Sequence, residues 1–112
     1  MTTNTALQAA HDLLTTWTIQ ESEPETNRLD IVLDADNLLR AVRALDGVRW
    51  GYLAGITGLD LGTEAGLMEV LYHFCSRAAI LTLRVRTPRD RASVPSITDV
   101  LPTASFYERE LR

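Results

Sequence analysis

The sequence predicts a two-layer α+β domain, with helices packed on one face of a mixed, mostly antiparallel sheet. Two observations support this prediction. Apolar residues recur with a helical period in residues 5–17 and 36–46, and they alternate with polar residues in the remaining segments. The expected order is helix, two strands, helix, three strands and then short C-terminal helices. We expect residues 1–112 to form a single domain.

The first helix is predicted over residues 5–17. Its apolar stripe consists of Leu7, Ala10, Leu14 and Trp17. Thr5 and Gln8 have the spacing of a capping box, which predicts that the helix begins at Thr5. Residues 17–21 alternate in polarity and form a candidate short strand, and the acidic residues 21–27 are expected to be a loop or hairpin end.

A half-buried strand and a second helix are predicted next. In the strand, three apolar residues alternate with three others, namely Leu29, Ile31 and Leu33 with Asp30, Val32 and Asp34. The helix covers residues 36–46, and its apolar face consists of Leu38, Leu39, Val42 and Leu45. Asp36 is the expected N-cap of this helix, and Gly47 is its expected C-terminal stop.

Three antiparallel strands should follow, over residues 53–61, 68–74 and 80–86, joined by turns at residues 62–66 and 75–78. Glycines inside the first of them predict a bend or bulge. The last strand should present one apolar and one polar face. These faces consist of Leu81, Leu83 and Val85 on one side, and of Thr82, Arg84 and Arg86 on the other.

Composition excludes several classes of protein. One Cys cannot form a disulfide framework, which favours a reduced, cytosolic setting. The net charge of −4 argues against a general nucleic-acid binder, although Gly55-Ile-Thr-Gly58 matches the loop of KH-type RNA-binding domains and leaves an RNA-binding module as an alternative. The longest uncharged stretch, residues 50–59, is too short to span a membrane.

No set of residues has the spacing of a metal or catalytic site. His73 and Cys75 lie two residues apart on one strand face, but the only other His is His11, and zinc needs three or four protein ligands. Asp34 and Asp36 have the spacing of the first two ligands of a calcium-binding loop. Such a loop needs an oxygen ligand and a glycine next, where this sequence has Leu38 and Leu39. We therefore expect no catalytic residue, no metal and no cofactor in this chain.

The second half of the sequence contains three informative blocks. They are Glu69-Val-Leu-Tyr72-His73-Phe74, then Val94-Pro95-Ser96-Ile97-Thr98-Asp99-Val100-Leu101-Pro102, and finally Phe106-Tyr107-Glu108-Arg109-Glu110. With the earlier Ile56-Thr57-Gly58-Leu59-Asp60, they resemble the C subunit of respiratory complex I, the 30 kDa subunit family of NADH:quinone oxidoreductase. The resemblance covers about residues 28–112.

The sequence departs from the family pattern at its end. The family continues beyond Glu-Arg-Glu with a C-terminal tail, whereas this sequence stops at Arg112, so the resemblance implies a truncated member. Phe106 occupies a position where the family usually has Trp, and Thr103 one where it often has Gly.

The resemblance implies a scaffold protein without a redox cofactor. Such a scaffold belongs to the peripheral arm, at the cytoplasmic inner face of the cell membrane. It docks onto the large 49 kDa subunit that forms the quinone site, beside other peripheral-arm proteins. Equivalent proteins occur in membrane-bound hydrogenases and in F420H2 dehydrogenase, and the sequence does not specify the electron donor or acceptor.

The expected docking surface lies between residues 84 and 112. This segment has six Arg and four acidic residues, whereas residues 1–83 have five Arg and eleven acidic residues. The last helix has no C-cap before Arg112, so we expect it to fray or to promote self-association when the partner is absent. The candidate docking residues are Arg84, Arg86, Pro95, Ser96, Asp99, Phe106, Glu108, Arg109 and Glu110.

Overall fold

The computed structural model describes residues 3–62, 64, 66–88, 96–98, 100, 101, 104 and 108, with side chains from residue 5 onward. The elements are α1 (Thr3–Leu14), β1 (Gln20–Ser22), β2 (Arg28–Leu33), α2 (Leu38–Gly47), β3 (Tyr52–Asp60), β4 (Leu67–Ser76) and β5 (Ala79–Pro88). A short 3-10 helix, η1 (Thr15–Trp17), follows α1, and a second one, η2 (Ala35–Asn37), directly precedes α2. The predicted order of helices and strands is confirmed.

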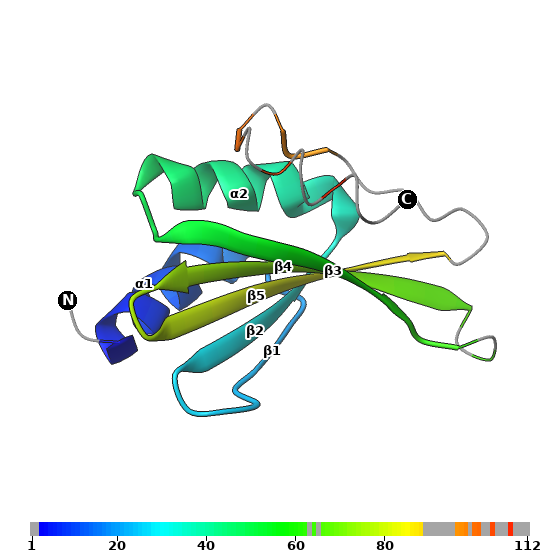
Figure 1. Ribbon diagram of the computed structural model, residues 1–112, viewed down its shortest axis with the longest axis horizontal. Helices are drawn as coiled ribbons and strands as arrows, with labels where there is room; N and C mark the ends of the chain where they lie inside the picture. The colour runs from blue at the N-terminus through cyan, green and yellow to red at the C-terminus, as the bar shows by residue number, and fades with distance from the viewer. Residues whose placement is uncertain are drawn as a thin grey trace.

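The five strands form one mixed sheet in the order β1-β2-β5-β4-β3 (Figure 1). Only β2 and β5 run parallel among these neighbours, and the other pairs are antiparallel. The parallel pair occupies the centre because the chain leaves β2, passes through α2 and the β3–β4 hairpin, and returns as β5. The far ends of β3, β4 and β5 project beyond the helical layer (Figure 1).

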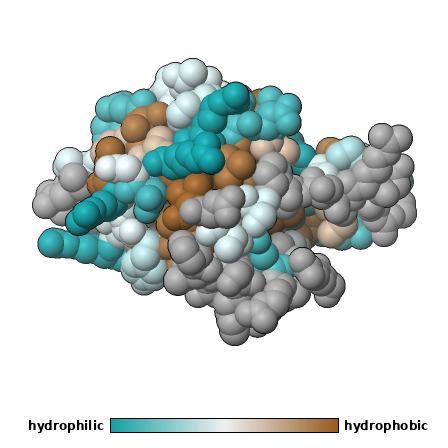
Figure 2. Space-filling view, turned by 90° about the horizontal axis from the view of Figure 1, so that it is seen from above, coloured by the Kyte–Doolittle hydropathy of each residue, from teal (hydrophilic) through white to brown (hydrophobic). Residues whose placement is uncertain are grey.

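Both helices pack on the same face of the sheet, as the sequence predicts. The helices contribute Ala6, Ala10, Leu14, Leu38, Ala41, Val42 and Leu45 to one core, and the strands contribute Leu29, Ile31, Leu33, Leu53, Val70, Tyr72, Phe74, Leu81, Leu83 and Val85. The Trp50 indole links the segment after α2 to α1, because its Nε1 donates to the Ala6 carbonyl oxygen at 2.7 Å. Viewed from the α2 side, hydrophilic side chains form the outside of this layer, beside a smaller apolar area (Figure 2).

The ends of α1 differ from the prediction. The helix begins at Thr3, so Thr5 lies inside it and is not its first residue, and the Gln8 side chain donates to Asp12 Oδ1 at 2.9 Å. It ends at Leu14 and continues as the 3-10 turn η1. Threonine hydroxyls satisfy two of the last carbonyls, since Thr15 Oγ1 donates to His11 O at 2.7 Å and Thr18 Oγ1 donates to Leu14 O at 2.9 Å. The residues after the helix only partly follow the predicted strand over 17–21, since β1 covers Gln20–Ser22.

The ends of α2 also correct the prediction. The N-cap is Asn37 instead of Asp36, and it makes no side-chain capping bond because its Oδ1 accepts from Arg40 Nη1 at 2.8 Å. Gly47 is the last residue of the helix, and the helix is closed by Arg49, whose φ is 54° and whose amide donates to the Asp46 carbonyl oxygen at 3.0 Å. A second left-handed residue follows at Gly51, whose φ is 61°. Only glycine fits at this position, because a Cβ on Gly51 would lie 2.0 Å from a backbone oxygen of β4.

The strand region confirms the predicted bulge and corrects one turn. The register of β3 against β4 shifts between Leu53 and Gly55. The turn between β4 and β5 consists of Arg77 and Ala78, whereas the sequence predicts a turn over residues 75–78. Cys75 therefore lies inside β4, and the turn is tight because Arg77 adopts a left-handed φ of 56°.

The described residues after β5 return to the helical side of the sheet. Ile97 and Ala104 are fully buried in the core. The amides of Val100 and Leu101 donate to the Ile97 carbonyl oxygen at 3.1 and 2.8 Å, so a turn occupies the start of the predicted short helix. Glu108 is helical, as expected for a last helix over residues 106–112, and Ala104 is helical as well.

Candidate interaction surface

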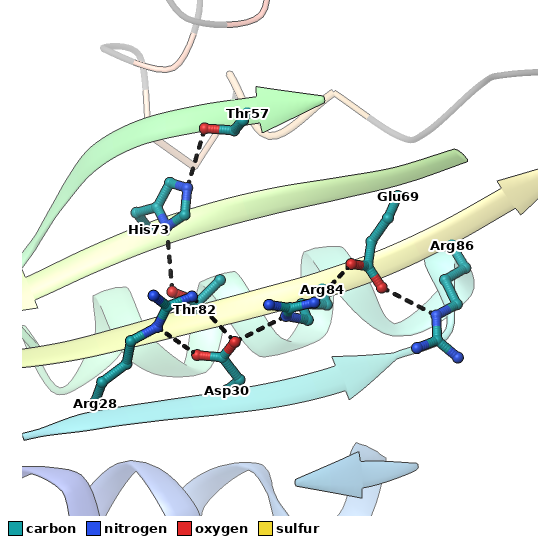
Figure 3. Close-up of polar contacts among 8 residues, drawn as sticks. All are labelled: Arg28, Asp30, Thr57, Glu69, His73, Thr82, Arg84 and Arg86. Atoms are coloured by element: carbon teal, nitrogen blue, oxygen red, sulfur yellow. Dashed lines mark hydrogen bonds and ion pairs between the residues drawn. The ribbon is translucent and has the colours of Figure 1, made fainter. Parts of the chain in front are cut away.

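The sheet face opposite the helices carries cross-strand rows of polar side chains (Figure 3). This open face is defined by residues that pair across four strands. One row joins Gly55, His73, Thr82 and Asp30, the next joins Thr57, Leu71, Arg84 and Val32, and a third joins Leu59, Glu69 and Arg86. Neither helix lies on this face, yet its two carboxylates, Asp30 and Glu69, are buried.

Asp30 is a buried carboxylate held between two guanidinium groups. Its side chain is 2% exposed. Arg28 on the same strand donates from Nε to Oδ1 at 2.8 Å and from Nη2 to Oδ2 at 3.1 Å. Arg84 on β5 donates from Nε to Oδ2 at 2.8 Å. The hydrogen bond to Asp30 is the largest reason why the pKa of Arg28 rises above its ordinary value.

Glu69 on β4 repeats this arrangement two rows further along the sheet. Its side chain is 1% exposed, and each carboxylate oxygen accepts from a different arginine. Arg84 Nη1 donates to Oε1 at 2.8 Å, and Arg86 Nε donates to Oε2 at 3.0 Å. Arg84 therefore bridges the two buried carboxylates. The resulting side-chain network has three positive and two negative charges, and it consists of Arg28, Asp30, Arg84, Glu69 and Arg86.

His73 lies at the other end of this polar face. Its Nε2 and Nδ1 lie 3.1 and 3.2 Å from the hydroxyl oxygens of Thr57 and Thr82. Burial is the main cause that lowers the pKa of His73, and the positive charges of Arg28 and Arg84 act in the same direction. Neutral His73 accepts at one nitrogen and donates at the other, which suits two hydroxyl partners.

A second polar centre joins two of the sequence blocks on the helical side of the sheet. One Glu108 carboxylate oxygen accepts from the Ile97 amide at 2.8 Å. The other accepts from the hydroxyls of Ser96 at 2.8 Å and Thr98 at 3.1 Å. Burial and, second, the charge of Glu108 raise the pKa of the Tyr72 phenol. Glu108 thus links the residue 96–98 segment to the last helix.

The described docking candidates fall on two faces of the sheet. Arg84 and Arg86 lie on the open face, whereas Ser96 and Glu108 lie at the second polar centre on the helical side. The structure therefore does not bring these four residues into one patch. The other candidates lie outside the described residues, namely Pro95, Asp99, Phe106, Arg109 and Glu110.

The sequence reasoning missed Asp30, Glu69 and Arg28 as members of a charged network. A signal was present, because a carboxylate lies between apolar residues in both β2 and β4, where burial requires a partner. The sequence could not predict which residue would be that partner, because Asp30 and Arg84 are 54 residues apart.

Three other interpretations of the sequence can be compared with the geometry. Gly55 and Gly58 lie inside β3 and pair with β4, so they do not form the loop that the RNA-binding alternative requires. Within the described part of the chain, no three His, Cys, Asp or Glu side chains come together as a metal-binding group. Across the same residues, no helix is both long and apolar enough to cross a bilayer.

Comparison with known proteins points to one family. A model of the family described as respiratory-chain NADH dehydrogenase, 30 kDa subunit, matches residues 31–112. The C subunit of NADH-quinone oxidoreductase from Ruegeria pomeroyi is 33% identical over 104 residues, which cover 89% of this chain and 50% of that protein. The C subunit of F(420)H(2) dehydrogenase from Methanosarcina mazei is 29% identical over 86 residues, covering 74% of this chain and 54% of that protein. The chain spans about half the length of these curated relatives.

Solved structures share the fold. A chain of the archaeal membrane-bound sulfane sulfur reductase superposes with a TM-score of 0.77 at 23% identity, covering 96% of this chain and 65% of that one. The trypsin-resistant fragment (1–134) of Nqo5 superposes with a TM-score of 0.76 at 21% identity, covering 96% of this chain and 87% of that one. At these identities the likeness shows a common fold.

Proposed function

We propose a function from one premise: this chain belongs to the family of the 30 kDa subunit of respiratory-chain NADH dehydrogenase, whose model matches residues 31–112. The chain acts as a non-catalytic scaffold in the peripheral arm of an NADH:quinone oxidoreductase. It docks onto the large subunit that forms the quinone site, at the cytoplasmic face of the membrane. The family match is the observation that carries this proposal.

The charged residues of the open face support a scaffold role. Asp30 and Glu69 are each held by two arginines, so both carboxylates serve the sheet itself and are poorly placed to exchange protons with a substrate. Arg86 differs from the other arginines in the network because 45% of its side chain is exposed. A pocket of about 150 Å3 opens beside Arg84 and Arg86 and extends to Gln20 and Ser22 of β1.

Arg86 is the described residue best placed to contact the large subunit. Its Nε binds Glu69, which fixes the guanidinium against the sheet, and its exposed part can bind a carboxylate of the partner. Ser96 and Glu108 contribute indirectly by holding the chain that leads to Arg109 and Glu110. Those two residues, with Pro95, Asp99 and Phe106, remain part of the proposed surface.

Co-expression with a large subunit of an NADH:quinone oxidoreductase from the same organism, followed by affinity capture, tests the proposal. We expect Arg86→Ala to weaken capture roughly tenfold, about 1.4 kcal/mol, because a fixed arginine is a common interface anchor. Glu69 keeps Arg84 as a partner in this variant, so the sheet should remain folded. Arg43→Ala, on the exposed side of α2, is the matched control and should leave capture unchanged.

Arg109→Ala tests the C-terminal part of the same proposal. Deleting residues 96–112 is a poorer test, because the deletion removes Ile97 and Ala104 from the core. If Arg86→Ala and Arg109→Ala both bind like the unaltered chain, the docking surface lies elsewhere.

A second candidate function is that of the equivalent scaffold in an F420H2 dehydrogenase. The similarity to the Methanosarcina mazei protein over 74% of this chain favours it. The membrane-bound hydrogenase alternative predicts a large subunit with a different metal centre. Purifying the assembled complex and measuring which reduced donor it oxidises, NADH, F420H2 or hydrogen, separates these three.

A further inference from the structure

One further row of residues belongs to the open face, at the end beyond His73. It joins four residues across the strands, namely Tyr52, Cys75, Ile80 and Arg28. On each of these strands, a residue directly beside this row is buried in the core. Because side chains alternate along a strand, the row itself points away from the helices.

This row makes one end of the open face apolar and exposed. Tyr52 and Ile80 are 65% and 37% exposed, and Leu59, further along the same face, is 44% exposed. Three of the five large apolar side chains that are exposed among the described residues therefore lie on this one face. Exposed apolar side chains are normal when they are scattered, whereas a group of them on one face indicates a contact surface.

The opposite end of the open face presents positive charge. The carboxylates of Asp30 and Glu69 are only 2% and 1% exposed. The side chains of the arginines that hold them are more accessible, at 24% for Arg28, 28% for Arg84 and 45% for Arg86. A partner at this end therefore meets guanidinium groups, and carboxylates are the groups that complement them.

A pocket of about 150 Å3 lies at this arginine end, between Arg84, Arg86 and β1. Glu21 borders the pocket, but its carboxylate turns to the helical side of the sheet, where Oε1 lies 2.6 Å from His11 Nδ1. The pocket can therefore accept a carboxylate from another protein. Ile80 and Arg86 are six residues apart on β5, which places the apolar end and the pocket about 20 Å apart.

We propose that the open face binds a segment of the large subunit that places apolar side chains against Tyr52 and Ile80 and, about 20 Å away, a carboxylate in the pocket at Arg86. This inference rests on the proposed function, and it specifies the face and the partner chemistry through which the two proteins meet. A second copy of this chain is a poorer occupant of the face, because its own open face presents arginines where a carboxylate is needed.

Capture of the co-expressed large subunit tests the apolar end. Ile80→Lys and Tyr52→Ser should each weaken capture at least about tenfold, because each removes an apolar contact from the interface. Val48→Lys is the matched control, since Val48 is 60% exposed at the end of α2, and it should be captured normally. Circular dichroism and urea unfolding should show that each variant remains folded.

Cys75 provides a second readout that leaves the face unaltered. It is the only cysteine in the sequence, and it lies half-buried in the apolar row. We expect iodoacetamide to modify Cys75 at least about tenfold more slowly in the complex than in the free chain, as measured by mass spectrometry of its peptide. A variant with Cys75→Ser and Arg43→Cys moves the thiol to the exposed side of α2, where binding should not change the rate.

The outcomes separate this inference from the proposed function. If the unaltered chain captures no large subunit, both are wrong. If it does capture the subunit, normal capture of Ile80→Lys and Tyr52→Ser, or unchanged modification of Cys75 in the complex, overturns the open-face inference alone. Slower modification of Cys75 in the free chain at high concentration would assign the face to a second copy, which also overturns it.

Discussion

Replacing Asp30 by Asn tests how strongly the buried charges hold the sheet together. The carboxylate is 2% exposed and accepts three hydrogen bonds, at 2.8, 3.1 and 2.8 Å, from Arg28 and Arg84. An amide of the same shape offers one acceptor oxygen and turns an N–H2 donor toward guanidinium donors. The change therefore removes the counter-charge of two arginines at once.

Asp30→Asn should lower the free energy of unfolding substantially, but by less than the loss of one partner from a fully buried ion pair does. Breaking a buried ion pair on one side costs about 3–5 kcal/mol. Arg28 and Arg84 remain 24% and 28% exposed, so water can solvate part of each guanidinium after the change. We therefore expect Asp30→Asn to lower the free energy of unfolding by about 2–4 kcal/mol, which is roughly 8–16 °C in Tm for a domain of this size.

Urea unfolding monitored by tryptophan fluorescence and circular dichroism measures this change by linear extrapolation. Asp46→Asn, at an exposed position near the end of α2, is the matched control and should cost less than about 0.5 kcal/mol. The double variant with Arg84→Met should cost at least about 1 kcal/mol less than the sum of the single changes, because the partners are then lost together. A cost below about 1 kcal/mol for Asp30→Asn would refute the reasoning.

Three further changes have expected outcomes. Folding lowers the pKa of His73 below its ordinary 6.5, so the folded chain binds fewer protons than the unfolded chain near that pH. The free energy of unfolding therefore falls as the pH drops through 6.5. His73→Gln should reduce the loss of unfolding free energy measured between about pH 7.5 and pH 5. Gly51→Ala should lower the free energy of unfolding by more than about 2 kcal/mol, whereas Gly47→Ala, where a Cβ meets nothing within 4 Å, should raise it by up to about 1 kcal/mol. Glu108→Gln should cost about 1–3 kcal/mol in urea unfolding and speed amide exchange at Ile97, and unchanged exchange there would contradict the role of this carboxylate.

The periodic part of the fold was readable from the sequence. In β5, Leu81, Leu83 and Val85 are all completely buried, and Arg84 and Arg86 lie on the opposite face, as strict alternation predicts. The two helical stripes likewise predicted which faces would meet the sheet. These predictions succeed because burial of one face fixes the orientation of every side chain in a regular element.

The exact ends of helices and strands, and the pairing of strands far apart in the sequence, could not be predicted from the sequence. The β4–β5 turn depends on Arg77 in a left-handed conformation, and no glycine or asparagine marks that position. The pairing of β2 with β5 joins residues more than fifty positions apart, so the sequence could not place Asp30 beside Arg84. The charged network depends on that register, and it was missed for the same reason.

For the family-like blocks at the end of the chain, a motif alone does not separate a role in the fold from the proposed role in docking. Glu108 was a docking candidate, yet its carboxylate accepts three hydrogen bonds from Ser96, Ile97 and Thr98 of its own chain. If the proposed docking surface is right, a change at Glu108 would weaken capture even without direct contact, because this carboxylate holds the segment of Ser96, Ile97 and Thr98. The ambiguity is smaller for Arg86, because Glu69, which accepts from Arg86 Nε, also accepts from Arg84 and so keeps a partner when Arg86 is changed. A loss of capture in Arg86→Ala with unchanged stability would thus report on contact, whereas the same loss in Glu108→Gln would report on folding.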